Sequence, residues 1–106
     1  MRVGIVLAFV IAVLAPAGCG GGPDEAEEDR AVAAAKEAYA EAKAEGVDFA
    51  NGPCLGAIME NWVADVAHDP RQDVDDEPEN QCEAFRSGEA DHFVELDLDG
   101  NLIRAE

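Results

Sequence analysis

The sequence predicts an α+β fold: an amino-terminal, alanine-rich helix packed on a small antiparallel sheet that ends in a carboxy-terminal β-hairpin, with one disulfide. Three observations support it. Residues 24–45 have the composition of a helix, and residues 92–105 alternate between apolar and polar side chains around an Asp-Gly turn. Cys54 and Cys82 form a pair that a single disulfide would join.

The first 18 residues have the pattern of an export signal. Arg2 precedes an unbroken apolar run of about thirteen residues, from Val3 to Ala15. A helix needs roughly 20 apolar residues to cross the hydrocarbon core of a membrane, so this run is too short to be a stable span. We expect residues 1–18 to be a signal peptide and the remainder to work outside the cytoplasm.

The end of this segment fits two modes of processing. Ala17-Gly18-Cys19 resembles the end of the lipobox of bacterial lipoproteins, although Pro16 stands where that family has an aliphatic residue. The resemblance implies that Cys19 carries lipid and anchors the chain to the outer face of the bacterial cell membrane, with residues 19–30 as a flexible tether. The alternative is ordinary cleavage after Ala17, which would leave a secreted or periplasmic protein.

The mature chain is short and strongly acidic. Removal of residues 1–18 leaves 88 residues, enough for one small globular domain, expected over residues 31–106. Six basic residues against 24 acidic ones give this part a formal charge of −18. Nucleic-acid binding draws most of its affinity from cations that neutralise phosphates, so we expect no nucleic-acid partner. The simplest interpretation of the many acidic residues is that they keep the protein soluble.

The two remaining cysteines are expected to bond to each other. With Cys19 assigned to the anchor, Cys54 and Cys82 are an even pair in an exported chain of fewer than 100 residues. A crosslink closing a loop of about 29 residues would stabilise the fold by roughly 3.5 kcal/mol on the chain-entropy model. The alternative is a metal pair or a reactive thiol, but neither cysteine belongs to a Cys-x-x-Cys element.

The amino-terminal helix is expected from Asp24 to Glu45, where nearly every residue is Ala, Glu, Lys, Asp or Arg, and Gly46 is placed to end it. Its apolar stripe is narrow, so we expect the carboxy-terminal half to pack and the first turns to fray into the tether. The stripe consists of Val32, Ala35, Tyr39 and Ala42.

The middle of the chain is expected to hold short elements. Residues 54–58 fit a short strand or an irregular disulfide-tied loop, and residues 62–67 alternate as a strand, with a helix continued from Ala57 as the alternative. Residues 68–80 have the composition of a surface loop in which only Val74 could enter a core. A short helix is predicted from Pro78 or Glu79 to Arg86, with Cys82 and Phe85 pointing inward.

The carboxy-terminal hairpin is the clearest supersecondary element. With a two-residue turn at Asp99-Gly100, Leu96 would face Ile103 and Glu95 would face Arg104. A longer turn from Asp97 to Gly100 would shift the register by one residue. The core is expected to be thin for a domain of this size. Its predicted members are Val47, Phe49, Leu55, Ile58, Trp62, Val63, Val66, Phe85, Val94, Leu96, Leu98 and Ile103.

No metal ligands or cofactors are predicted. Asp73, Asp75 and Glu77 have the spacing of a calcium loop, but Pro78 stands where glycine makes the bend and Ala84 where an acid closes the site. A second alternating set also lacks a closing ligand, and turn chemistry explains its residues. That set is Asp97, Asp99 and Asn101. His68 and His92 are isolated, and zinc needs three or four converging ligands.

Catalysis by a hydroxyl group is disfavoured because the chain has one serine, Ser87, and no threonine. Ser87, Asp91 and His92 could be drawn as a triad, but they lack the glycine-framed turn of a nucleophile elbow. Trp62 is the sole tryptophan, and we expect it in the core rather than on a binding surface.

Parts of the mature chain resemble short bacterial exported proteins that carry no assigned activity. The segments concerned are residues 52–55, 62–71, 80–82 and 92–104. The resulting hypothesis is a non-catalytic, membrane-anchored envelope lipoprotein that acts as an interaction or accessory module. Its partners would be the membrane, through Cys19, and an envelope protein. The alternative is an acidic cation-binding or small hydrolytic domain that uses the acidic loop with His68 and His92.

Overall fold

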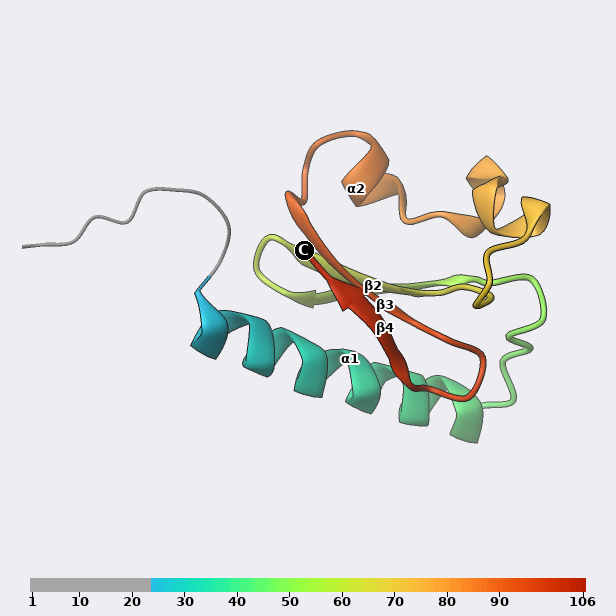
Figure 1. Cartoon of the computed structure of the whole chain (residues 1–106), viewed down its shortest axis with the longest axis horizontal. Helices are drawn as coiled ribbons and strands as arrows, with labels where there is room; N and C mark the ends of the chain where they lie inside the picture. The colour runs from blue at the N-terminus through green and yellow to red at the C-terminus, as the bar shows by residue number, and fades with distance from the viewer. Residues whose placement is uncertain (1–23) are drawn as a thin grey trace, which may run out of the picture.

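The structure, a computed structural model, describes residues 24–106 and has the predicted α+β fold. A long helix α1 is followed by four strands and a crossover of short helical turns (Figure 1). The elements are α1 (Glu25–Ala44), β1 (Cys54–Met59), β2 (Trp62–Val66), η1 (Asp73–Asp76), η2 (Pro78–Asn80), α2 (Glu83–Arg86), β3 (His92–Leu96) and β4 (Leu102–Ala105). Within residues 24–106, no helix combines the length and apolar character needed to span a membrane.

Helix α1 confirms the predicted boundaries to within one residue at each end. The side chain of Asp24 accepts a hydrogen bond from the backbone N–H of Glu27 at 2.7 Å, which caps the first turn. Acidic side chains in that turn complement the positive end of the helix dipole. Gly46 adopts a positive φ of 86°, the left-handed conformation that lets the chain leave the helix.

The four strands form one sheet in the order β1-β2-β3-β4, and the sheet is mixed rather than fully antiparallel. β1 pairs with β2 and β3 pairs with β4 in antiparallel fashion, but β2 and β3 are parallel. Parallel neighbours need a crossover of a dozen residues or more, and residues 67–91 provide it. The expectation of an antiparallel sheet was wrong at this central pair because strand direction depends on the path of the crossover.

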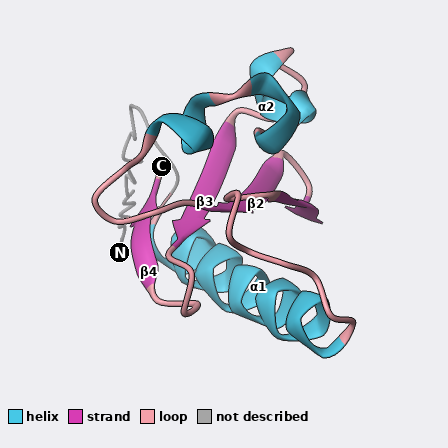
Figure 2. Ribbon diagram, turned by 90° about the vertical axis from the view of Figure 1, so that its right-hand side faces the viewer, coloured by secondary structure: helices cyan, strands magenta, loops and turns pink. Residues whose placement is uncertain are grey.

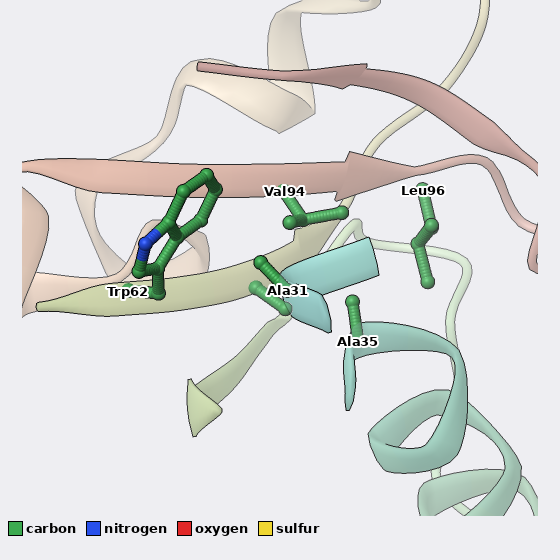
Figure 3. Close-up of a cluster of buried hydrophobic side chains, with 6 residues drawn as sticks. Ala31, Ala35, Trp62, Val94 and Leu96 are labelled. Carbon is green, nitrogen blue, oxygen red and sulfur yellow. The ribbon is translucent and has the colours of Figure 1, made fainter. Parts of the chain in front are cut away.

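The two faces of the sheet are covered by different parts of the chain. Helix α1 lies along one face, and α2 with the rest of the crossover lies over the other (Figures 1 and 2). The side chains facing α1 form the main core, which Figure 3 shows in close-up. Its fully buried members are Ala31, Ala35, Trp62, Ala64, Val94 and Leu96.

The amino-terminal half of α1 packs against the sheet, contrary to the expectation that it would fray. Ala31 and Ala35 have no exposed surface, and their small side chains let the helix approach the strands closely. The indole Nε1–H of Trp62 donates to Glu27 Oε2 at 2.8 Å. The globular unit therefore includes residues of the expected tether, and a boundary at residue 31 would cut through the helix.

The carboxy-terminal hairpin confirms one predicted pair and corrects the other. Glu95 lies opposite Arg104, but Leu96 lies opposite Leu102 rather than Ile103, because the register shifts after Glu95. The loop is longer than two residues because the Asp97 side chain accepts backbone hydrogen bonds from Asp99 at 2.9 Å and Asn101 at 2.8 Å.

The crossover is tied to the sheet by the predicted disulfide. Cys54 at the start of β1 bonds to Cys82, with Cα atoms 4.9 Å apart. The expected helix around Cys82 is broken into two short pieces, η2 and α2, and α2 is a single turn. Cys82 is buried as predicted, but Phe85 and Val47, both placed in the expected core, are each 41% exposed.

Candidate functional site

A cavity of about 400 Å³ lies between the sheet and the crossover, on the face of the sheet opposite α1. The strands supply its floor, because alternate residues of β2 and β3 point away from the main core. The floor residues are Val63, Asp65, Phe93, Glu95 and Arg104. The crossover supplies its walls, which are Arg71, Gln81, Cys82, Phe85 and Arg86. We call this cavity the arginine pocket.

Glu95 is the centre of the charged network in the arginine pocket. It is a buried acid, 4% exposed, on β3. Its Oε2 accepts a hydrogen bond from Arg71 Nη1 at 2.7 Å, and its Oε1 lies 3.2 Å from Arg104 Nε. The two ion pairs compensate the cost of burying the carboxylate. They also tie the crossover and β4 to the centre of the sheet.

Arg71 connects Glu95 to the crossover. Its Nε donates to Asp76 Oδ1 at 2.9 Å, and its Nη2 donates to the backbone oxygen of Asp75 at 3.3 Å. The hydrogen bonds to Glu95 and Asp76 raise the pKa of Arg71 above its ordinary value, so this side chain carries its charge at any working pH. The guanidinium of Arg71 therefore links the crossover to Glu95 on the sheet.

Asp65 lies opposite Glu95 on the neighbouring parallel strand. Unlike Glu95, Asp65 has a buried oxygen, Oδ1, whose burial no hydrogen-bond partner compensates in the described part of the chain. Burial raises the pKa of Asp65 to about 7, and the charge of Glu95 adds to the rise. Arg71 and Arg104 act in the other direction without cancelling it. Asp65 therefore holds a proton in mildly acidic solution.

The arginine pocket concentrates positive charge in an acidic protein. Arg71, Arg86 and Arg104 are three of the six basic residues in residues 24–106, which also hold 24 acidic residues. Arg86 is exposed, and in residues 24–106 its side chain makes no ion pair within 4.0 Å. Arg104 contacts Glu95 through Nε, and among residues 24–106 its two terminal amino groups make no hydrogen bond.

Two phenylalanines give the pocket an apolar wall. The rings of Phe85 on α2 and Phe93 on β3 meet edge to face, with centroids 5.0 Å apart. The guanidinium carbon of Arg104 lies 5.5 Å from the centroid of Phe93, within cation–π range. The cavity thus presents aromatic surface next to positive charge.

Asp75 is a structural acid beside the pocket rather than part of a calcium loop. It is 3% exposed, whereas the sequence suggested that only Val74 of this segment could be buried. Its carboxylate accepts from the backbone N–H groups of Gln72 at 2.8 Å and His68 at 3.1 Å, and lies 3.0 Å from His68 Nδ1. Burial opposes its ionisation, but these hydrogen bonds outweigh that effect and lower the pKa of Asp75.

The residues of the hypothetical triad are directed to different partners. His92 stacks on Trp62, with ring centroids 4.8 Å apart. Asp91 accepts a hydrogen bond from the Asn61 side chain at 3.3 Å, and the hydroxyl of Ser87 donates to the backbone oxygen of Ala84 at 3.3 Å. The structure therefore does not bring a hydroxyl nucleophile and its base together.

The two histidines are not brought to one site. His92 pairs with Trp62 at one end of the parallel strands, and His68 follows β2 at the other end. A second cavity, of about 240 Å³, does place His68 and Asp69 beside Asp97 and Asp99 of the hairpin loop. Among residues 24–106, however, no three His, Cys, Asp or Glu side chains are grouped to hold a metal ion.

Of the other predicted site residues, Cys54 and Cys82 form their disulfide. Cys19 lies outside the described residues. Trp62 is completely buried, as expected for a core residue.

None of the expectations from the sequence placed a site at the arginine pocket. The available signal was an acid on the same strand face as an apolar neighbour, Asp65 after Val63 and Glu95 after Phe93. An acid in such a position is expensive to bury without a partner. Nothing in the order of residues showed that Arg71 and Arg86 would be brought to it from the crossover.

Comparison of the chain with protein-family models, with curated proteins and with solved structures finds no match.

Proposed function

We propose that this protein is an exported, lipid-anchored binding module of the cell envelope, without catalytic activity, whose ligand site is the arginine pocket. One observation carries the proposal: a cavity of about 400 Å³ is lined by Asp65, whose buried Oδ1 has no hydrogen-bond partner within residues 24–106. Its volume falls in the range of small-molecule sites, roughly 300–1,000 Å³. A buried polar atom without a partner is costly in a native protein, and a bound ligand would supply the partner.

The chemistry of the pocket supports binding over catalysis. Glu95, the carboxylate nearest in register to Asp65, is held by Arg71 and Arg104, so each of its two oxygens already has a partner. Both cysteines of the domain are consumed in the disulfide. The donors and the aromatic wall can hold and orient a ligand without any bond being made or broken.

The proposed location of the protein is supported by its disulfide and by the sequence around Cys19. A small domain tied by a disulfide is consistent with an extracytoplasmic location, where such bonds persist. The resemblance of Ala17-Gly18-Cys19 to a lipobox supports anchoring at Cys19. Intact mass of the membrane fraction tests this part: we expect a diacylglycerol-modified Cys19 at the amino terminus. A released chain beginning at Gly18, after cleavage at Ala17, would overturn the anchor.

A ligand screen tests the site. We expect small molecules from a fragment library to shift the NMR resonances of Val63, Phe85 and Phe93, and the Phe85→Ala variant to lose these responses. Val47→Ala is the matched control, because Val47 has the same 41% exposure as Phe85 and does not line the pocket. Hits that all cluster elsewhere, or that survive Phe85→Ala unchanged, would remove the pocket as the binding site.

A second candidate function, a small hydrolytic domain, is favoured by one specific observation. Burial raises the pKa of Asp65 to about 7, which suits a general acid, and Asp65 lies beside Glu95, whose carboxyl group pairs with Arg71 and Arg104. Chromogenic ester and glycoside substrates test this candidate. It requires turnover by the wild type that Asp65→Asn abolishes, and turnover that persists in Asp65→Asn would indicate a contaminant.

A further inference from the structure

The charge of the arginine pocket points to the charge of its ligand. Three arginines and two acids, Asp65 and Glu95, line the pocket, and the raised pKa of Asp65 leaves that acid uncharged at pH 6. Arg71 is paired with Glu95 and Asp76. The donors left for a ligand are therefore the guanidinium of Arg86 and the two terminal amino groups of Arg104. These groups suit an oxyanion, since a guanidinium presents parallel N–H groups that match the two oxygens of a carboxylate.

The acidity of the whole protein does not cancel this local preference. At physiological ionic strength, charges separated by more than about 8 Å are largely screened in water. The acids on the exposed face of α1 lie on the other side of the sheet from the pocket, whereas residues 67–91, which form the pocket wall, carry nine acids, of which Asp76 pairs with Arg71. They slow the approach of an anion, but the arginines in contact with it decide how tightly it is held.

Asp65 supplies a hydrogen-bond donor when it is protonated. The charged groups around it come from every element that packs on this face: Glu95 from β3, Arg104 from β4, and Arg71 and Asp75 from the crossover. Each oxygen of Glu95 already has an arginine partner, and Asp75 is bonded to His68 and Gln72. A ligand oxyanion is thus a suitable acceptor for the carboxyl O–H of Asp65.

The apolar wall defines the rest of the ligand. Phe85, Phe93 and Val63 line the same cavity, and Phe85 is 41% exposed. An exposed aromatic side chain gains free energy when an apolar body covers it, about 25 cal/mol for each Å² removed from water. A bare inorganic anion would leave this surface uncovered.

We propose that the arginine pocket binds a small organic acid, a carboxylate attached to an apolar body the size of one or two rings, and that it binds this ligand more tightly as the pH falls from 8 to 6. This proposal rests on the proposed function and adds the chemical class of the ligand. Arg86 and Arg104 hold the carboxylate, protonated Asp65 donates to it, and Phe85 and Phe93 cover the apolar body. Neutral or cationic compounds of the same shape lack the group that the arginines bind.

Isothermal titration calorimetry with 2-naphthoate as the probe tests the proposal. A donor that must be protonated, with a pKa of about 7, gives an affinity about tenfold higher at pH 6 than at pH 8. 2-Naphthylmethylamine has the same rings with the opposite charge, and inorganic phosphate has negative charge without rings. We expect both to bind at least tenfold more weakly than 2-naphthoate at pH 6.

Variants separate the contributions of the pocket residues. Arg86→Gln should weaken 2-naphthoate binding about tenfold, and its exposed position keeps folding intact. Arg30→Gln is the matched control, an exposed arginine on α1, and should leave the affinity unchanged. Asp65→Asn should still bind, because an amide N–H donates, but the difference between pH 6 and pH 8 should disappear.

The outcomes distinguish this inference from the proposed function. Tighter binding of 2-naphthylmethylamine than of 2-naphthoate, lost in Phe85→Ala, would overturn the organic acid and leave the pocket as the binding site. Equal binding of phosphate and 2-naphthoate would overturn the apolar body. Binding of 2-naphthoate that neither Arg86→Gln nor pH affects would overturn the whole inference. If none of the probes binds, the inference fails, and the fragment screen then decides on the proposed function.

Discussion

Asp65 and Glu95 are register partners on the parallel strands β2 and β3, and the structure gives them opposite electrostatic environments. Glu95 is compensated by Arg71 and Arg104, whereas a buried oxygen of Asp65 has no partner in residues 24–106. One acid therefore holds the crossover on the sheet, and the other is free to titrate near neutral pH and to meet a ligand.

Asp65 should make the protein less stable as the pH rises. Its pKa is about 7 in the folded protein and 3.8 in the unfolded chain, so between these values the folded state binds the extra proton. The free energy of unfolding then falls as the pH increases from about 4 to about 7. Asp65→Asn should be more stable than the wild type by about 2–4 kcal/mol at pH 8 and nearly equal to it at pH 4.

Urea unfolding at pH 4, 6 and 8 measures this difference. Effects of other titrating groups, including Asp75, are common to both proteins and cancel in the comparison. A constant offset between the two proteins at all three pH values would contradict the assigned titration.

Glu95→Gln should destabilise the domain by about 2 kcal/mol at pH 7. Breaking a fully buried ion pair costs about 3–5 kcal/mol, but Arg71 and Arg104 are 37% and 49% exposed and can partly turn to solvent. Denaturant unfolding gives the loss directly. Glu37→Gln, an exposed position on α1, is the control and should stay within about 0.5 kcal/mol of the wild type.

Gly52→Ala should be among the most damaging single substitutions. Gly52 has a φ of 67°, and a Cβ placed there would collide with Oδ1 of Asp75 and lie 2.8 Å from the backbone oxygen of Val66. We expect a loss of more than about 3 kcal/mol in the free energy of unfolding. Gly46→Ala is the control: φ is also positive, but the space is open, so a cost of about 1 kcal/mol is expected. Equal losses in thermal or urea unfolding would mean that the contact with Asp75 is unimportant.

Glu27→Ala should show that the first turns of α1 belong to the domain. The substitution leaves the Nε1–H of Trp62 buried without a protein partner, which costs about 1–3 kcal/mol. The fluorescence of Trp62, the sole tryptophan, reports both the local change and the shift in unfolding. Glu25→Ala removes a neighbouring acid of the same turn without touching Trp62 and should cost at most a few tenths of a kcal/mol. If the two variants behave alike, the residues before 31 act as a tether.

Loss of the disulfide should lower stability by roughly 3.5 kcal/mol, because it closes a loop of 28 residues in sequence separation between Cys54 and Cys82. The double variant Cys54→Ala, Cys82→Ala measures this loss in urea unfolding. Reductant should reproduce the loss in the wild type and have no effect on the double variant. An unchanged midpoint in the double variant would show that the crossover holds without the bond.

The local patterns in the sequence predicted a large part of the fold. Helix α1, the pairing of Glu95 with Arg104 and the Cys54–Cys82 bond were all predicted from neighbouring residues or from counting cysteines. The errors have two sources, the packing of distant segments and one local loop. Phe85 lines the arginine pocket instead of lying in the expected core. Leu96 pairs with Leu102 instead of Ile103 because hydrogen bonds to the Asp97 side chain stabilise a longer loop.

Composition, short-range periodicity and cysteine number were enough to predict the α+β class, the amino-terminal helix, the disulfide and the acidity of the domain. The direction of β3 beside β2 and the formation of the arginine pocket could be seen only in the folded protein. Both depend on the path of residues 67–91, which carries Arg71 and Arg86 back over the acids of the sheet. That path is set by burial and charge compensation among residues far apart in the chain, and no local pattern encodes it.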